Sequence, residues 1–271
     1  MSERKYGYIT FLSDYGYTDE FVGVCHGVIK RIAPQVEIID ITHGIRPQSV
    51  FEGAMVLAQS VAYMPHGVHL AIVDPSVGAE RLALAIRTVD GSVLVGPDNG
   101  LLSMAVRRLG GADACHQISN PEVMLEVVSK TFQGRDIFAP AAAHLANGVA
   151  VAQMGAPVDP AGLVGVDIAA PRRHDDHYHA TVLHVDRFGN LQLNLGPKEM
   201  ADAEMKVGDM LEVRLEGHRS LVAFGETFAS VGQGELVVTE DSYGLLAVAM
   251  NRGSAADLLG ASIGSSVIIG P

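Results

Sequence analysis

The sequence offers its clearest chemistry in an acid and an arginine, Asp74 and Arg81, within the segment V-D-P-S-V-G-A-E-R at residues 73–81. Asp74 ends an apolar run, and the proline that follows prevents the run from continuing as a strand. If the loop between the two residues folds back, the guanidinium of Arg81 pairs with the carboxylate, keeps it ionised and retains donors for water or an anion. The common alternative is that Asp74 and Pro75 only form a turn. The presence of Arg81 favours the interpretation of Asp74 as a site residue.

A second segment, T-F-Q-G-R-D-I-F-A-P at residues 131–140, supplies the amide of Gln133 at the end of another apolar stretch. An amide can orient a water molecule through its donors and its acceptor, but it does not titrate near neutral pH. Gln133 is therefore suited to positioning a nucleophile and not to accepting its proton.

Two further acids, Asp14 and Asp19, lie in S-D-Y-G-Y-T-D-E at residues 13–20, directly after the first apolar run. An acid at the end of a first strand can accept both hydroxyls of a ribose. The alternative is that Asp14 begins a turn and Thr18 or Asp19 caps a helix. No G-x-G-x-x-G or G-x-x-x-x-G-K pattern is present in the sequence, so we expect a ligand without a phosphate chain.

The second half of the chain carries polar turns and a histidine-rich segment. In V-D-R-F-G-N-L at residues 185–191, Phe188 can stack on a flat base while Asn190 reads its edge, or the segment is a hairpin whose phenylalanine packs inward. The turns D-S-Y-G and A-M-N-R-G-S-A, at residues 241–244 and 249–255, fit a site that straddles two domains. The run H-D-D-H-Y-H at residues 174–179 matches no standard zinc spacing, so we expect a solvated connector and no metal.

Bulk properties exclude several classes of protein. Hydrophobic residues make up 48% and charged residues 18% of the 271 residues, which is typical of a globular chain, and no apolar run approaches the roughly 20 residues of a membrane span. The net charge of −12 argues against nucleic-acid binding. The start of the chain lacks an apolar signal region, and its two cysteines lie far apart, so we expect a cytoplasmic protein.

These candidate residues must be positioned by two kinds of domain. Up to residue 170, strand-like and helix-like runs alternate, which predicts an α/β domain with a largely parallel sheet. Residues 171–179 read as a linker, and residues 180–271 as an all-β, barrel-like domain of short strands. The expected strands are 8–12, 36–41, 68–73, 82–89, 93–95, 178–186, 192–195, 210–215, 220–224, 235–240, 245–250 and 266–269, and the expected helices are 21–32, 50–63, 101–109 and 140–147.

Seven motifs occur in a specific order: S-D-Y-G-x-x-D at 13–19, H-G-I-R-P at 43–47, V-D-P-S-V-G-A-E-R at 73–81, G-P-D-N-G at 96–100, T-F-Q-G-R-D-I-F-A-P at 131–140, D-R-F-G-N-L at 186–191 and N-R-G-S-A-A at 251–256. The set resembles the S-adenosylmethionine hydroxide adenosyltransferases, which are S-adenosylmethionine hydrolases related to fluorinase and chlorinase. Each motif is weak alone, but the combination is specific and covers nearly the whole chain.

The resemblance implies displacement at the ribose 5′ carbon by water or hydroxide, which gives adenosine and L-methionine. It also implies no cofactor beyond the substrate, and a homotrimer whose sites form between the N-terminal domain of one subunit and the C-terminal domain of the next. The catalytic set would be Asp74, Arg81 and Gln133. Asp14 matches the ribose-binding acid, and the other substrate-binding positions would be Asp19, Phe132, Asp186, Phe188, Asn190, Phe228, Ser242 and Asn251.

Position 133 departs from the family pattern, because the hydrolases have histidine there. If that histidine accepts a proton, its absence lowers the rate on the order of 10²- to 10⁴-fold; if it only positions water, the loss is small. We therefore expect intact S-adenosylmethionine binding with weakened turnover. An S-adenosylmethionine- or adenosine-binding sensor or sink is the alternative, and a metal-dependent, phosphatase-like hydrolase using residues 174–179 ranks last. Halogenation is disfavoured because halogenases have an aromatic residue where this chain has Asp74, whose charge repels halide.

Overall fold

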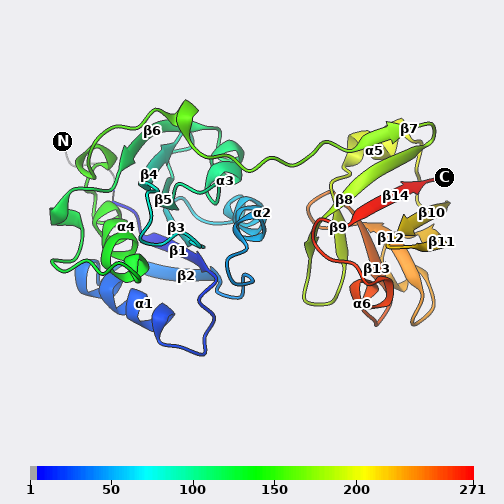
Figure 1. The fold of residues 1–271 in the computed structure, drawn as a ribbon, viewed down its shortest axis with the longest axis horizontal. Coiled ribbons are helices and arrows are strands. Elements are labelled where there is room, and N and C mark those ends of the chain that lie inside the picture. Colours follow the sequence, from blue (N-terminus) through cyan, green and yellow to red (C-terminus); the bar gives the residue numbers. More distant parts are fainter. Residues whose placement is uncertain (1–4) are drawn as a thin grey trace. The chain divides into compact units, whose positions relative to one another are not determined.

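The computed structural model describes residues 5–271, which divide into two compact units, one ending at Val166 and the other beginning at Asp167 (Figure 1). Each unit has its own sheet and its own core of buried side chains. No helix within residues 5–271 is long and apolar enough to cross a membrane.

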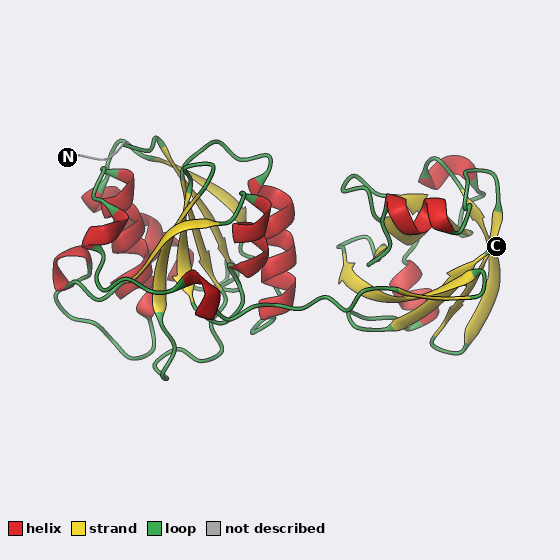
Figure 2. Ribbon diagram, turned by 90° about the horizontal axis from the view of Figure 1, so that it is seen from above, coloured by secondary structure: helices red, strands yellow, loops and turns green. Residues whose placement is uncertain are grey.

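The N-terminal unit is built on a six-stranded, mostly parallel sheet in the order β2-β1-β3-β5-β4-β6. The first four strands of this order run parallel, and β4 pairs antiparallel with both of its neighbours. Helices cover both faces of the sheet (Figure 2). The elements are β1 (Tyr8–Ser13), α1 (Phe21–Ile32), β2 (Glu37–Thr42), α2 (Val50–Val61), β3 (Val68–Ile72), β4 (Ala83–Thr88), β5 (Val93–Pro97), α3 (Ser103–Arg108), β6 (Ala112–Gln117), the π-helix η2 (Gly134–Phe138) and α4 (Ala139–Ala146).

The burial of the central strands follows from the helices on both faces of the sheet. All five residues of β3 are buried, as are five of the six residues of β1, because neither face of the sheet meets water. Helix α1 buries Val22, Cys25 and Ile29 on one stripe against the sheet.

Helix α4 ends at a glycine, as the sequence predicts. Gly148 has φ +92°, its N–H donates to the carbonyl of Leu145, and the N–H of Val149 donates to the carbonyl of His144. These two bonds form the Schellman arrangement, which satisfies carbonyls at the end of the helix.

The C-terminal unit is a seven-stranded β-barrel with a short eighth strand at its edge. The ring β8-β14-β10-β11-β12-β13-β9 closes because β8 pairs with both β14 and β9, and β7 extends β8. Its elements are β7 (Arg172–His174), β8 (His177–Val185), β9 (Leu191–Leu193), α5 (Pro197–Asp202), β10 (Met210–Leu215), β11 (His218–Phe224), β12 (Leu236–Glu240), β13 (Leu246–Met250), α6 (Ala255–Leu259) and β14 (Ser266–Gly270).

The predicted fold class is confirmed, and each predicted strand and helix is present with bounds shifted by at most a few residues. The sequence pattern missed β6, α5, α6 and β7. Strand β6 is an edge strand with mixed burial, so it lacks a continuous apolar run. Residues 171–179, which we expected to be a linker, contain β7 and the beginning of β8.

Candidate active site

The acid Asp74 and the arginine Arg81 form a nearly buried ion pair at the end of β3. Asp74 is the second residue after the strand, and the loop up to Arg81 folds back as expected. Arg81 donates from Nε and Nη2 to the same Asp74 oxygen, Oδ2, at 2.9 and 2.5 Å. The side chains of Asp74 and Arg81 are only 5% and 9% exposed. A charge-assisted pair with so little solvent contact fixes both groups in position.

Gln133 completes this group from a distant part of the chain. Its carbonyl oxygen Oε1 accepts a hydrogen bond from Arg81 Nη2, although the two residues are 52 positions apart. The residue precedes the π-helix η2, and the π-turn brings Gly134 and Gln133 toward β3. Arginine only donates, so the amide must present its oxygen to Arg81 and its NH₂ group elsewhere.

A cavity of about 230 Å³ lies beside this group. Four of the predicted site residues line it: Asp14, Asp74, Phe132 and Gln133. Six residues that the sequence analysis did not single out also line it, namely Tyr15, Phe21, Ile72, Val77, Thr131 and Gly134. Four of them, Tyr15, Val77, Thr131 and Gly134, lie within the motifs at residues 13–19, 73–81 and 131–140, and this was the available signal.

Three acidic and aromatic groups around the cavity, Asp14, Tyr15 and Phe132, are fixed by contacts with other residues. Asp14 follows β1, and its Oδ2 accepts the backbone N–H of Gln48 at 2.8 Å. Tyr15 and Phe132 meet edge to face with ring centroids 5.9 Å apart. Burial, with the nearby Cys25, Asp14 and Asp74, raises the pKa of Tyr15 far above its usual value. Tyr15 therefore remains a neutral phenol in this site.

Asp19 does not join the cavity, since it is exposed and absent from the cavity lining. Of the two acids in the first motif, only Asp14 therefore lines the cavity. Asp19 lies just before α1, with Glu20 between them.

The remaining candidates lie in turns of the C-terminal unit. Asp186 organises the turn between β8 and β9: its Oδ1 accepts the N–H groups of Phe188 and Asn190, and its Oδ2 accepts the Asn190 side-chain amide at 2.7 Å. The Phe188 side chain is 74% exposed, so the inward-packing alternative is wrong within this unit. The side chain instead projects into solvent, where a flat ligand or another surface can contact it.

The other three candidates in this unit are also at or near the surface. Ser242 is exposed in the turn before β13, and Phe228 is 48% exposed in a short 3₁₀-helix. Asn251 is half-buried, and its side-chain amide donates to the carbonyl of Val231 at 2.7 Å.

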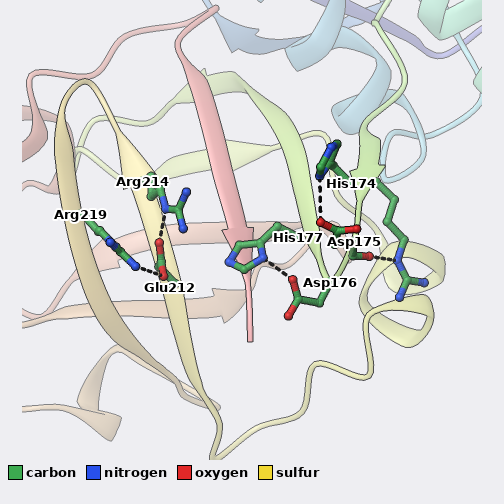
Figure 3. Close-up of polar contacts among 8 residues, drawn as sticks. His174, Asp175, Asp176, His177, Glu212, Arg214 and Arg219 are labelled. Atoms are coloured by element: carbon green, nitrogen blue, oxygen red, sulfur yellow. Dashed lines mark hydrogen bonds and ion pairs between the residues drawn. The ribbon is translucent and has the colours of Figure 1, made fainter.

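The histidine-rich segment forms the hairpin between β7 and β8 (Figure 3). His174 and His177 pair with the neighbouring Asp175 and Asp176 through Nδ1 at 3.3 and 2.6 Å. On the other side of β14, Glu212 accepts hydrogen bonds from Arg214 and Arg219. The two histidines thus have local ion-pair partners on the barrel surface.

Family models match both parts of the chain. The model described as SAM hydroxide adenosyltransferase N-terminal domain matches residues 9–155, and the model for the C-terminal domain of the same family matches residues 180–268. SAM denotes S-adenosylmethionine.

Individual relatives agree with this match. An (R)-S-adenosyl-L-methionine hydrolase of Salinispora tropica is 46% identical over 95% of both chains. A fluorinase of Nocardia brasiliensis is more distant, at 29% identity over 92% of this chain and 91% of its own. A solved structure, of an uncharacterised conserved protein from Thermotoga maritima, covers 97% of this chain and 100% of its own with a TM-score of 0.91 and 34% identity. Two domain models matching in order, together with this overall similarity, show that the chain belongs to the S-adenosylmethionine hydroxide adenosyltransferase family.

Proposed function

We propose that this protein hydrolyses S-adenosyl-L-methionine to adenosine and L-methionine, with Asp74, Arg81 and Gln133 acting on the nucleophilic water. The observation that carries the proposal is the buried Asp74–Arg81 pair beside the cavity, in a chain 46% identical to a named hydrolase. The name of that relative specifies the (R) form, which we propose as the substrate here as well.

The reaction suits a site with few charged groups beyond one ion pair. Oxygen of water attacks the ribose 5′ carbon, the bond from that carbon to sulfur breaks, and its electron pair goes to sulfur. The leaving group is then a neutral thioether, so no general acid is required, and the proton of water must pass to a base. Charge is neutralised as a hydroxide-like oxygen approaches the sulfonium, and exclusion of bulk water favours that step.

The contacts of Asp74 support a role as this base. Its Oδ2 is held by Arg81, whereas Oδ1 has only a long contact, 3.4 Å, from the hydroxyl of Ser76. The carbonyl of Gln133 is already used by Arg81. The NH₂ group of Gln133 is then free to face water, and it can donate to the oxygen but cannot take its proton. In this arrangement Gln133 positions the water, and Asp74 Oδ1 accepts its proton.

We assign substrate binding to the other candidate residues on the same basis. Asp14 and Phe132 line the cavity, where Asp14 is suited to the ribose hydroxyls. Asp19, Asp186, Phe188, Asn190, Phe228, Ser242 and Asn251 are proposed from the family resemblance. The exposed ring of Phe188 supports a role in stacking on adenine.

We propose a homotrimer with sites between subunits, which gives exposed Phe188 and Phe228 a partner surface. We also propose residues 1–170 as the catalytic domain and residues 180–271 as the β domain; residues 171–179, expected as a linker, contain β7 and the beginning of β8. A cytoplasmic location is supported by Cys25 and Cys115, which are both free thiols.

A binding protein without significant turnover is the second candidate, favoured by the amide at position 133. The test is a chromatographic time course with each sulfonium epimer of S-adenosylmethionine, comparing the protein with its Gln133→His variant. With Asp74 as the base, both proteins form adenosine at similar rates; if the histidine accepts the proton instead, the variant forms adenosine on the order of 10²- to 10⁴-fold faster. A parallel sample with added halide detects halogenated nucleoside. Calorimetric binding with no adenosine from either protein would overturn the hydrolase proposal and support the binding protein.

A further inference from the structure

Two histidines and an aspartate converge in the N-terminal unit, outside the lining of the cavity. His26 lies on α1, Asp40 on β2, and His43 directly follows β2. The Nε2 atoms of His26 and His43 lie 2.9 and 3.1 Å from the same oxygen, Oδ1 of Asp40. Within residues 5–271 this is the one group of three histidine, cysteine or acidic side chains whose ligand atoms all lie within 4.8 Å of one another.

His43 provides an independent sign that the group is incomplete. Its side chain is fully buried, and its Nε2 has no hydrogen-bond partner of acceptable geometry among residues 5–271, although the Asp40 carboxylate is only 3.1 Å away. A buried polar nitrogen without a partner destabilises the folded state. A cation between this nitrogen and the carboxylate would remove that destabilisation.

The other ring nitrogen of His43 is held in the manner of a metal ligand. Its Nδ1 is 2.7 Å from the hydroxyl of Ser13, which also accepts the N–H of Tyr15. When Nδ1–H donates to Ser13, the lone pair of Nε2 points toward Asp40. A hydrogen bond to the second nitrogen is the usual support of a metal-bound histidine.

The donor set and spacing select the kind of ion. Bonds of about 2.0–2.2 Å around tetrahedral zinc place ligand atoms about 3.3–3.6 Å apart. The nitrogen–oxygen separations here are 2.9 and 3.1 Å, so side-chain movements of a few tenths of an ångström would admit the ion. Two imidazoles with a carboxylate suit zinc and similar divalent transition metals, whereas calcium and magnesium prefer oxygen ligands alone. The side chains of His26 and Asp40 are 31% and 27% exposed, which gives an ion access from solvent and leaves a position for water.

We propose that His26 Nε2, the Asp40 carboxylate and His43 Nε2 form a zinc site with a water molecule as the fourth ligand. The ion would join α1 to the end of β2 and to the loop that follows β1. His43 contacts the end of β1 through Ser13 and the loop that follows through the N–H of Gly16, which donates to the His43 carbonyl at 2.8 Å. Because Asp14 lies in the same loop, the ion would also stiffen one wall of the cavity, a consequence that rests on the proposed function.

The alternative is a network of ordinary hydrogen bonds centred on Asp40. The hydroxyl of Tyr17 also points at this carboxylate, 3.4 Å from Oδ2, and His26 has hydrogen-bond geometry to Oδ1. In that case the group holds no ion and the imidazoles are simply donors.

The test is a calorimetric titration of the full-length, metal-free protein with Zn²⁺, followed by a titration with Co²⁺ read by visible absorption. We expect one ion per chain, with the absorption bands of four-coordinate cobalt. His26→Ala removes a partly exposed ligand outside the cavity lining and should weaken zinc binding by about tenfold or more. Zinc should raise the melting temperature of the wild type more than that of this variant, because an ion that binds the folded state more tightly stabilises it more.

Two further variants make the result decisive. Asp40→Asn removes the charge that His26 and His43 share, and serves if His26→Ala fails to fold by circular dichroism. His174→Ala is the matched control, because His174 is an exposed histidine 3.3 Å from an aspartate, and it should leave zinc binding unchanged. Absence of saturable zinc binding in the wild type, or binding unaffected by both His26→Ala and Asp40→Asn, overturns the site. The titrations contain no substrate, so either result leaves the proposed hydrolysis to be judged separately.

Discussion

The ion pair of Asp74 and Arg81 illustrates how one residue depends on its partners. Both side chains are nearly excluded from water, where an isolated charge would be strongly unfavourable. Arg81 is satisfied by Asp74 and Gln133, and its guanidinium lies 5.2 Å from the centre of the Phe138 ring. Removing one charge of this pair therefore disturbs the position of the partner side chain as well as the chemistry of the site. A substitution that keeps the shape of the side chain separates these two effects most clearly.

Asp74→Asn is expected to lower the rate of adenosine formation by about 10²-fold or more, because an amide cannot accept the proton of water. The amide oxygen can still accept from Arg81, so affinity for S-adenosylmethionine should stay within about threefold, less than 1.4 kcal/mol. Product chromatography gives the rate and calorimetry gives the affinity. Asp113→Asn, which changes an exposed acid paired with Arg87, is the control. Unchanged turnover in Asp74→Asn would remove Asp74 from the proposed mechanism.

At the scale of elements, the site is made where β1 and β3 end and where η2 begins. The two strands are parallel neighbours, so their carboxyl ends bring Asp14 and Asp74 to one edge of the sheet. The π-helix then places Gly134 against the Tyr15 hydroxyl, so closely that a Cβ at this position would collide with it. Glycine is thus required at position 134 because η2 and the Tyr15 side chain approach each other closely, and not because of its backbone angles.

Gly134→Ala should push Tyr15 or the beginning of η2 out of place and destabilise the protein by about 1–3 kcal/mol, as overpacking of a full core does. Affinity for S-adenosylmethionine should fall as well, because both segments line the cavity. Thermal unfolding and calorimetry measure the two effects. Gly23→Ala is the matched control, since a Cβ in that part of α1 meets no atom within 4 Å and should stabilise the helix by up to about 1 kcal/mol. A Gly134→Ala protein equal to the wild type in both assays would contradict the tight approach.

At the scale of the whole molecule, stability depends on polar groups sealed inside the parallel sheet. His69 lies on β3 and is 1% exposed, with its Nδ1 2.9 Å from the Thr10 hydroxyl on β1. Burial lowers the pKa of His69 to about 4, against 6.5 for an ordinary histidine. Between these values the unfolded chain binds a proton that the folded chain does not.

The free energy of unfolding should therefore be unaffected by His69 above pH 6.5 and fall as the pH is lowered toward 4, by roughly 3 kcal/mol in total. His69→Gln removes this titration, so its stability should decline less steeply over that interval, although His144, whose pKa burial also lowers, keeps some slope. Urea unfolding followed by circular dichroism at a series of pH values measures the slope. His174→Gln removes an exposed imidazole as a control. Identical slopes for wild type and His69→Gln would show that His69 titrates normally.

Local patterning accounts for what could be predicted before the fold was known. Apolar runs with periods near two and 3.6 located β1, β3, α1 and α4, because burial on a sheet or helix face is recorded in neighbouring residues. The same reasoning missed β6, which lies at an edge and is only partly buried, and could not separate β7 from a solvated connector because its three residues are exposed.

The sequence by itself determined the two-part architecture, the family, and the motifs that hold Asp14, Asp74 and Gln133. Only the tertiary structure decided that the carbonyl of Gln133 faces Arg81, 52 residues away, and that Asp19 lies outside the cavity. It alone brought His26 to Asp40 and His43. The physical reason is that periodicity reports which face of an element is buried, whereas the meeting of distant side chains depends on how whole elements pack, strand beside strand and helix against sheet.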